Sequence, residues 1–168
     1  MTGYNQEIVD LLQRLRPLSA QHALKDLHWV HGADEALDYC ADCGEKEVER
    51  LKAEKPDEAE DIFLDGGWGG QSSDSCPVCE KCGCQLDASL TDYGARAELA
   101  HFEENPPETA SAELAVEIER VLESFQWGGE AEDVARAAAL GRAFVALAAK
   151  DGLLPAEAAE AAPAPGVR

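Results

Sequence analysis

The chain has 168 residues, of which 34 are acidic and 14 are basic, so its formal net charge is −20. Such a surface repels phosphate backbones, and the sequence contains no basic patch of the kind that nucleic-acid binding normally requires. No apolar run is long enough to span a bilayer, and the first residues lack the basic start and apolar stretch of a signal peptide. We therefore expect a cytoplasmic protein without a membrane partner.

The N-terminal region has a helical pattern. Leucine and isoleucine recur at helical spacing over residues 5–15, and Arg16-Pro17 is expected to end that helix. Ser19 is a candidate cap for a second short helix that carries Leu24 and Leu27.

The middle of the chain alternates charged, apolar and glycine-rich segments. A charged helix is predicted over residues 45–54, and a short strand is predicted at 62–64. Residues 65–75 are rich in glycine and serine and are predicted to form a loop. Gln85-Leu86, after the last cysteine, is a candidate for the end of a small β-hairpin.

The last third is predicted to be helical. Thr91 is a candidate cap for a helix that ends near Glu104. Apolar stripes over residues 111–127 and 133–150 predict two helices that form an antiparallel hairpin. The expected division of the whole chain is N-terminal helices at 1–27, a metal-binding module at 28–107, the helical hairpin at 108–152 and a disordered Ala/Pro/Glu tail at 153–168.

The most specific motif is a duplicated Cys-x-x-Cys-Gly. It occurs at Cys40 to Gly44 and again at Cys79 to Gly83. Two such pairs can close a tetrahedral zinc site, and in a reducing compartment cysteines are more often metal ligands than disulfides. Glycine after the second cysteine of each pair suits a tight turn with positive φ. The predicted ligands of one structural zinc ion are Cys40, Cys43, Cys79 and Cys82.

Two further cysteines leave alternatives open. Cys76 can replace Cys82 as a ligand, because Cys76-Pro-Val-Cys79 is also a pair and its proline suits a turn. Otherwise Cys76 and Cys84 are small apolar side chains, free thiols beside the site, or ligands of a second zinc together with His28 and His31. A redox role for Cys-x-x-Cys normally uses one pair in a βαβ setting, which this sequence lacks.

Three stretches of the chain resemble small zinc-ribbon-like proteins of bacteria and their phages. They are Tyr39 to Lys46, Cys79 to Asp87, and the element Leu90-Thr-Asp-Tyr-Gly, and the likeness covers about residues 28–104. The resemblance implies a metal-binding module with the four predicted cysteines in the ligand positions, and it implies no reaction.

These observations predict a mainly α fold with a small β-hairpin, built as a zinc-ribbon or treble-clef-like centre and a C-terminal helical hairpin. Because four protein ligands leave zinc no open position, we expect no enzyme and no catalytic residues. The expected function is protein–protein interaction or regulation, with a partner that has a basic surface. The alternatives are a nucleic-acid-binding zinc ribbon, an acidic mimic of DNA and a thiol redox protein.

Overall fold

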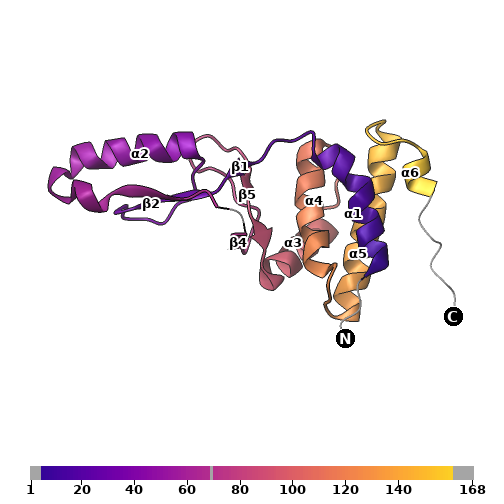
Figure 1. Ribbon diagram of the computed structural model, residues 1–168. Coiled ribbons are helices and arrows are strands. Elements are labelled where there is room, and N and C mark those ends of the chain that lie inside the picture. The colour runs from indigo at the N-terminus through magenta and orange to yellow at the C-terminus, as the bar shows by residue number, and fades with distance from the viewer. Residues whose placement is uncertain (1–4, 69, 161–168) are drawn as a thin grey trace. The chain divides into compact units, whose positions relative to one another are not determined.

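Helices dominate the structure, a computed structural model that describes residues 5–68 and 70–160 (Figure 1). The chain folds into two compact units. Unit 1 combines Met1–Ala23 with Leu90–Arg168, and unit 2 is the intervening segment Leu24–Ser89. The mainly helical content, with short strands and a cluster of cysteines, confirms the predicted fold class.

Unit 1 is a bundle of helices (Figure 1). Its helices are α1 (Gln6–Ser19), α3 (Asp92–Glu104), α4 (Ala112–Phe125), α5 (Ala131–Lys150) and the short α6 (Glu157–Glu160). As predicted, α4 and α5 pack together after a short connection, and both also contact α1 and α3. Helix α3 therefore groups with unit 1, whereas the sequence had suggested that it closes the metal-binding module.

Leucine, isoleucine and phenylalanine side chains from all four long helices fill the core of unit 1. The fully buried members include Ile8, Leu12, Leu15, Leu99, Ile118, Leu122 and Phe144. A Cβ atom at Gly141 of α5 would lie 3.0 Å from Leu11 of α1 and 3.2 Å from Leu122 of α4. The absence of a side chain at this point lets three helices approach one another closely.

One predicted helix end in unit 1 was wrong, and the start of the predicted tail differs from the structure. Helix α1 continues through Pro17 to Ser19, because Leu18 is 1% exposed and its burial outweighs the one hydrogen bond that proline removes. The tail predicted at 153–168 is ordered in its first residues, where Leu154 is buried and α6 forms. Residues 161–168 lie outside the described part of the chain.

Unit 2 combines one α-helix, one 3-10 helix and several short strands. These elements are β1 (Lys25–Asp26), β2 (His28–His31), α2 (Ala41–Glu54), η1 (Pro56–Asp61), β3 (Phe63–Gly66), β4 (Ser72–Ser73), β5 (Leu86–Asp87) and β6 (Ser89–Leu90). Strand β2 pairs antiparallel with β3, β1 pairs parallel with β5, and β4 pairs with β6, where the unit ends.

The second N-terminal helix predicted after Ser19 is absent, and β1 and β2 stand in its place. Val30 is buried and pairs with Leu64 of β3, so the cross-strand contact decides the conformation of a segment whose local pattern was ambiguous. The predicted short strand at 62–64 does form, as β3, but its antiparallel partner is the distant β2.

Helix α2 packs against the β2–β3 ribbon (Figure 1). The core between them is small, and two of the predicted zinc ligands belong to it. Its buried residues are Leu27, Val30, Tyr39, Cys40, Leu51, Ile62, Cys79, Leu86 and Ala88. Apolar packing and the cysteine cluster are therefore parts of one structure.

Candidate metal centre

The first cysteine pair lies at the N-terminus of α2. Cys40 is the N-cap residue, and its carbonyl oxygen accepts the first helical hydrogen bond from the Gly44 N–H at 2.9 Å. Cys43 lies in the first turn. A spacing of three residues places both sulfurs on the same side of the helix, at the end where the helix dipole favours negative charge.

The second pair lies in a tight turn, and the structure bears out the reason for its glycine. The Cys79 N–H donates to the Cys84 carbonyl at 2.8 Å, and the Gly83 N–H donates to the Cys79 carbonyl at 2.8 Å. Gly83 has a φ of 73°, a conformation that glycine adopts without a steric penalty. An antiparallel bridge between Val78 and Gln85 closes the small hairpin that the sequence predicted there.

The same explanation was wrong for the first pair. Gly44 is part of α2 and does not belong to the glycines with positive φ. A Cβ atom at Gly44 would lie 2.4 Å from the Leu64 side chain. This glycine therefore serves the close packing of α2 on β3, and not a turn after Cys43.

Four sulfur atoms meet between the helix terminus and the turn. The Sγ atoms of Cys40, Cys43, Cys79 and Cys82 all lie within 4.8 Å of one another. Tetrahedral geometry with zinc–sulfur bonds of about 2.3 Å requires sulfur–sulfur separations of about 3.8 Å. The Cys40 and Cys82 sulfurs are 3.8 Å apart. The donor set and the spacing both fit one Zn²⁺ ion, which these four residues could hold.

The electrostatics of the turn favour thiolates. Burial alone would raise the pKa of Cys79, but backbone N–H groups of Cys40, Cys82 and Lys81 lower that pKa to about 6. The backbone N–H of Cys84 likewise lowers the pKa of Cys82. A hydrogen bond with the Cys40 sulfur, together with desolvation, raises the pKa of Cys43 to about 12. In the absence of metal some thiols of the cluster therefore keep their protons, and metal binding would release these protons because each ligand must be a thiolate.

Cys84 lies beside the cluster without belonging to it. Its sulfur is 3.4 Å from the Cys82 sulfur, which is closer than two ligands of one tetrahedral zinc would lie. The four-sulfur group that could hold a metal ion includes Cys82 and not Cys76. The position of Cys84 could not be predicted from spacing, because it depends on the path of the chain after Gly83.

The second zinc site considered from the sequence is wrong for the described residues, which contain no other group of three or more potential ligands close together. His28 and His31 are engaged elsewhere. The Nδ1 atom of His28 lies 3.0 Å from the Asp26 carbonyl oxygen, and the Nε2 atom of His31 lies 2.9 Å from the Asp65 carboxylate.

Charged side chains connect α2 with the turn that holds the second pair. Glu47 on α2 is buried and accepts hydrogen bonds from Arg50 at 3.1 and 2.6 Å. Its other ion-pair partner is Lys81, at 3.6 Å, between Cys79 and Cys82. Hydrogen bonding by Arg50 lowers the pKa of Glu47, so the carboxylate is charged at neutral pH. The sequence offered no signal for this link, because Glu47 is one of many acidic residues on a charged helix.

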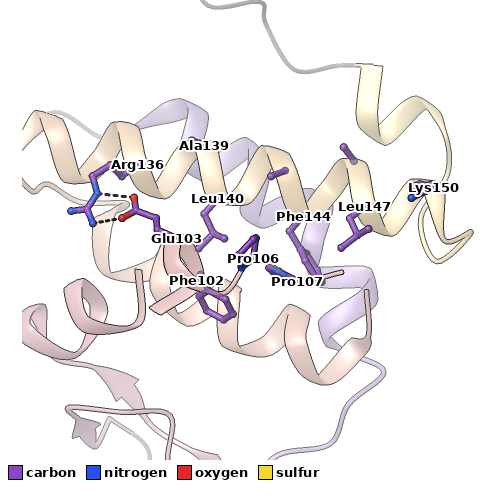
Figure 2. A pocket seen from close by; sticks show the side chains of 12 residues that line it. Phe102, Glu103, Pro106, Pro107, Arg136, Ala139, Leu140, Phe144, Leu147 and Lys150 are labelled. Atoms are coloured by element: carbon purple, nitrogen blue, oxygen red, sulfur yellow. Dashed lines mark hydrogen bonds and ion pairs between the residues drawn. The ribbon is translucent and has the colours of Figure 1, made fainter. Parts of the chain in front are cut away.

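Unit 1 contains a separate apolar groove of about 520 Å³. The end of α3, Pro106-Pro107 and one face of α5 line it (Figure 2). At one end Arg136 donates two hydrogen bonds to Glu103, at 2.8 and 2.6 Å, and Lys150 lies at the other end. Most of the lining is apolar, and it holds no cysteine, serine, threonine or histidine.

Comparison with known proteins does not assign the chain to a family: no family model, no curated protein and no solved structure matches it. Among the described residues, no helix has the length and apolar character needed to cross a membrane.

Proposed function

We propose that Cys40, Cys43, Cys79 and Cys82 bind one structural Zn²⁺ ion, and that the module this ion stabilises acts in protein–protein interaction or regulation. The observation that carries the proposal is the approach of four sulfurs from two distant pairs to within 4.8 Å. The proposed fold of the site is the zinc-ribbon or treble-clef-like arrangement that the sequence resemblance implies.

A structural and not a catalytic metal is supported by the ligand set. Four protein ligands complete the tetrahedral coordination of zinc and leave no position for water or substrate. Cys40 and Cys79, one from each pair, are 1% exposed and form part of the core of unit 2. In the proposed role the ion contributes free energy of folding, on the order of 10–16 kcal/mol in small zinc-binding peptides, which compensates for a small apolar core.

An interaction role with a basic partner protein in the cytoplasm is supported by charge. The net charge is −20, and four thiolates with one Zn²⁺ would add about −2. A negative surface attracts basic protein surfaces and repels phosphate backbones. Lys25, Lys55 and Arg50 of unit 2 form ion pairs with carboxylates of the same unit, which reduces the positive potential that a nucleic acid would require.

The test compares the purified full-length chain with Cys79→Ser and Cys84→Ser as baits for interacting proteins. We expect the wild type and Cys84→Ser to carry about one zinc per chain and to retain the same partner. Cys79→Ser is expected to lose both. A partner that nuclease treatment removes would favour nucleic-acid binding, and rapid alkylation of the four thiols in the zinc-loaded protein would favour a redox role. Retention of the partner by zinc-free Cys79→Ser would contradict the proposal.

A further inference from the structure

The β2–β3 ribbon carries aromatic side chains on the face opposite the core. In the antiparallel register Trp29 is opposite Asp65, and His31 is opposite Phe63. Residues directly opposite each other, and residues two apart along a strand, share a face of the ribbon. The intervening pair of Val30 and Leu64 packs into the core, so the other four side chains point away from it.

Trp68, in the loop after β3, extends this surface. Its ring makes an edge-to-face contact with Trp29, with ring centroids 5.5 Å apart and an interplanar angle of 85°. The His31 and Phe63 rings are stacked, with centroids 4.5 Å apart. We call the surface formed by Trp29, His31, Phe63, Asp65 and Trp68 the aromatic face.

The aromatic face is accessible within unit 2. Trp68 is 55% exposed and Phe63 is 46% exposed. Large aromatic side chains that gather at one exposed place are typical of interaction sites, whereas single exposed apolar residues are common and need no explanation. The core of unit 2 is small, and burying these large aromatic side chains in it would add to the stability of the unit. Their position outside the core therefore points to a partner.

Charge indicates what kind of partner fits. Residues 56–75 include six acidic residues, Asp57, Glu58, Glu60, Asp61, Asp65 and Asp74, and no lysine or arginine. Asp65 lies on the face itself, where its carboxylate accepts a hydrogen bond from the Gly66 N–H at 2.8 Å and contacts His31 at 2.9 Å. Phosphate is repelled by such a surface, but an arginine or lysine side chain is attracted to both the rings and the carboxylate.

We propose that the aromatic face binds a basic peptide segment of a partner protein, with an arginine or lysine side chain placed over the indole rings of Trp29 and Trp68 and paired with Asp65. The inference rests on the proposed interaction function and names the surface and the chemistry of the partner. An indole ring and a carboxylate that both lie within reach of one cation reinforce each other, because each attracts positive charge to the same place.

Isothermal titration calorimetry with a decapeptide of arginine, lysine, glycine and serine tests this proposal. The comparison peptide has every arginine and lysine replaced by glutamine. We expect the zinc-loaded wild type to bind the basic peptide and not the glutamine peptide, and binding to weaken with salt. Trp68→Ala and Asp65→Asn should each weaken binding by about tenfold, the scale of a single cation–π or ion-pair contact that is partly desolvated.

Matched variants separate the face from general effects. Tyr93→Ala removes another exposed aromatic ring, from unit 1, and Glu49→Gln removes a negative charge from the exposed side of α2. Both should bind as the wild type does. Equal affinity of all variants, failure of the wild type to bind the basic peptide, or Trp68-dependent binding of an oligothymidylate in its place would overturn the proposal.

Zinc content, measured on every sample, distinguishes the two proposals. A zinc-loaded wild type whose peptide binding does not depend on Trp68 and Asp65 would disprove the aromatic face as the site and leave the structural zinc intact. A wild type that binds no zinc contradicts the proposed function, whatever the peptide does.

Discussion

Cys79 and Cys84 are close in sequence, but they lie differently with respect to the four-sulfur cluster. Cys79 is a buried member of the four-sulfur cluster and receives several backbone hydrogen bonds, whereas Cys84 lies outside that group, with its sulfur 3.4 Å from the Cys82 sulfur. We predict that Cys79→Ser abolishes stoichiometric zinc binding, because a serine hydroxyl is a poor replacement for a thiolate ligand. Cys84→Ser should keep about one zinc per chain. Mass spectrometry of the native protein measures both, and loss of zinc from Cys84→Ser would show that the ligand set is different.

Glu47 is the second residue for which the structure suggests a measurable role. Its carboxylate joins Arg50 of its own helix to Lys81 of the turn between Cys79 and Cys82. We predict that Glu47→Gln lowers the affinity for zinc by about tenfold, because partners around a metal site orient its ligands. Competition with a zinc chelator measures the change. Glu49→Gln is the matched control on the same helix, and an equal effect of both substitutions would rule out a specific link.

The residues of the candidate site were partly predictable from the sequence. The spacing of the cysteines left Cys76 and Cys82 as alternatives, and the glycine after Cys82, which favoured Cys82, does adopt a positive φ. The same rule gave a wrong reason for the glycine at position 44, since Gly44 is helical and packs against Leu64. A contact with Leu64, which is far from it in sequence, explains why residue 44 is a glycine, and a single sequence does not reveal such contacts.

Among the elements, the β2–β3 ribbon depends on one backbone position. Gly66 has a φ of 100°, and a Cβ atom there would lie 2.6 Å from the Leu27 carbonyl oxygen and 2.9 Å from the His28 Cα. We predict that Gly66→Ala destabilises unit 2 by about 2–4 kcal/mol, because backbone strain and overlap with backbone atoms add together. Urea unfolding in a Trp127→Phe background follows unit 2 through the fluorescence of Trp29 and Trp68.

Gly70→Ala is the control for the ribbon. Gly70 has a φ of 87°, but nothing lies within 4 Å of the position that a Cβ atom would take. This substitution should cost only the strain of the backbone conformation, about 1–2 kcal/mol. Equal loss of stability in the two variants would mean that the close approach of β3 to β2 contributes little.

The capped helices were the most predictable elements and the short strands the least. The Thr91 hydroxyl accepts a hydrogen bond from the Gly94 N–H, so the predicted cap of α3 corresponds to a real contact. The Ser111 hydroxyl accepts one from the Leu114 N–H at the start of α4, which the apolar stripe alone had predicted. In contrast, β1 pairs with β5 across some sixty intervening residues. Strands of two residues have no periodicity, and only their distant partners define them.

At the scale of the whole molecule, the chain enters unit 1, leaves it to form unit 2, and returns. Helix α1 packs against α4 and α5, although the whole of unit 2 separates them in sequence. The sequence predicted the individual helices of unit 1 but not that α1 and α3 join the helical hairpin, because apolar stripes show which face of a helix is buried and not which helix covers it. Each unit has its own core, so the proposed zinc ion concerns only one of them.

This arrangement leads to a prediction for zinc removal from the full-length chain. A chelator should unfold residues 24–89, because the small core of that unit includes two of the proposed ligands. Unit 1 should remain folded, since its core is built from helices that contain no cysteine. Among the described residues α2, with 14 residues, is the one α-helix of unit 2, whereas α5 alone has 20, so most of the helical circular dichroism should persist. Hydrogen–deuterium exchange then assigns the loss: amides of α2 and β3 should exchange rapidly, those of α4 and α5 should stay protected, and added zinc should restore the first group. Unchanged protection of α2 in protein shown to be free of zinc would mean that apolar packing alone holds unit 2 together.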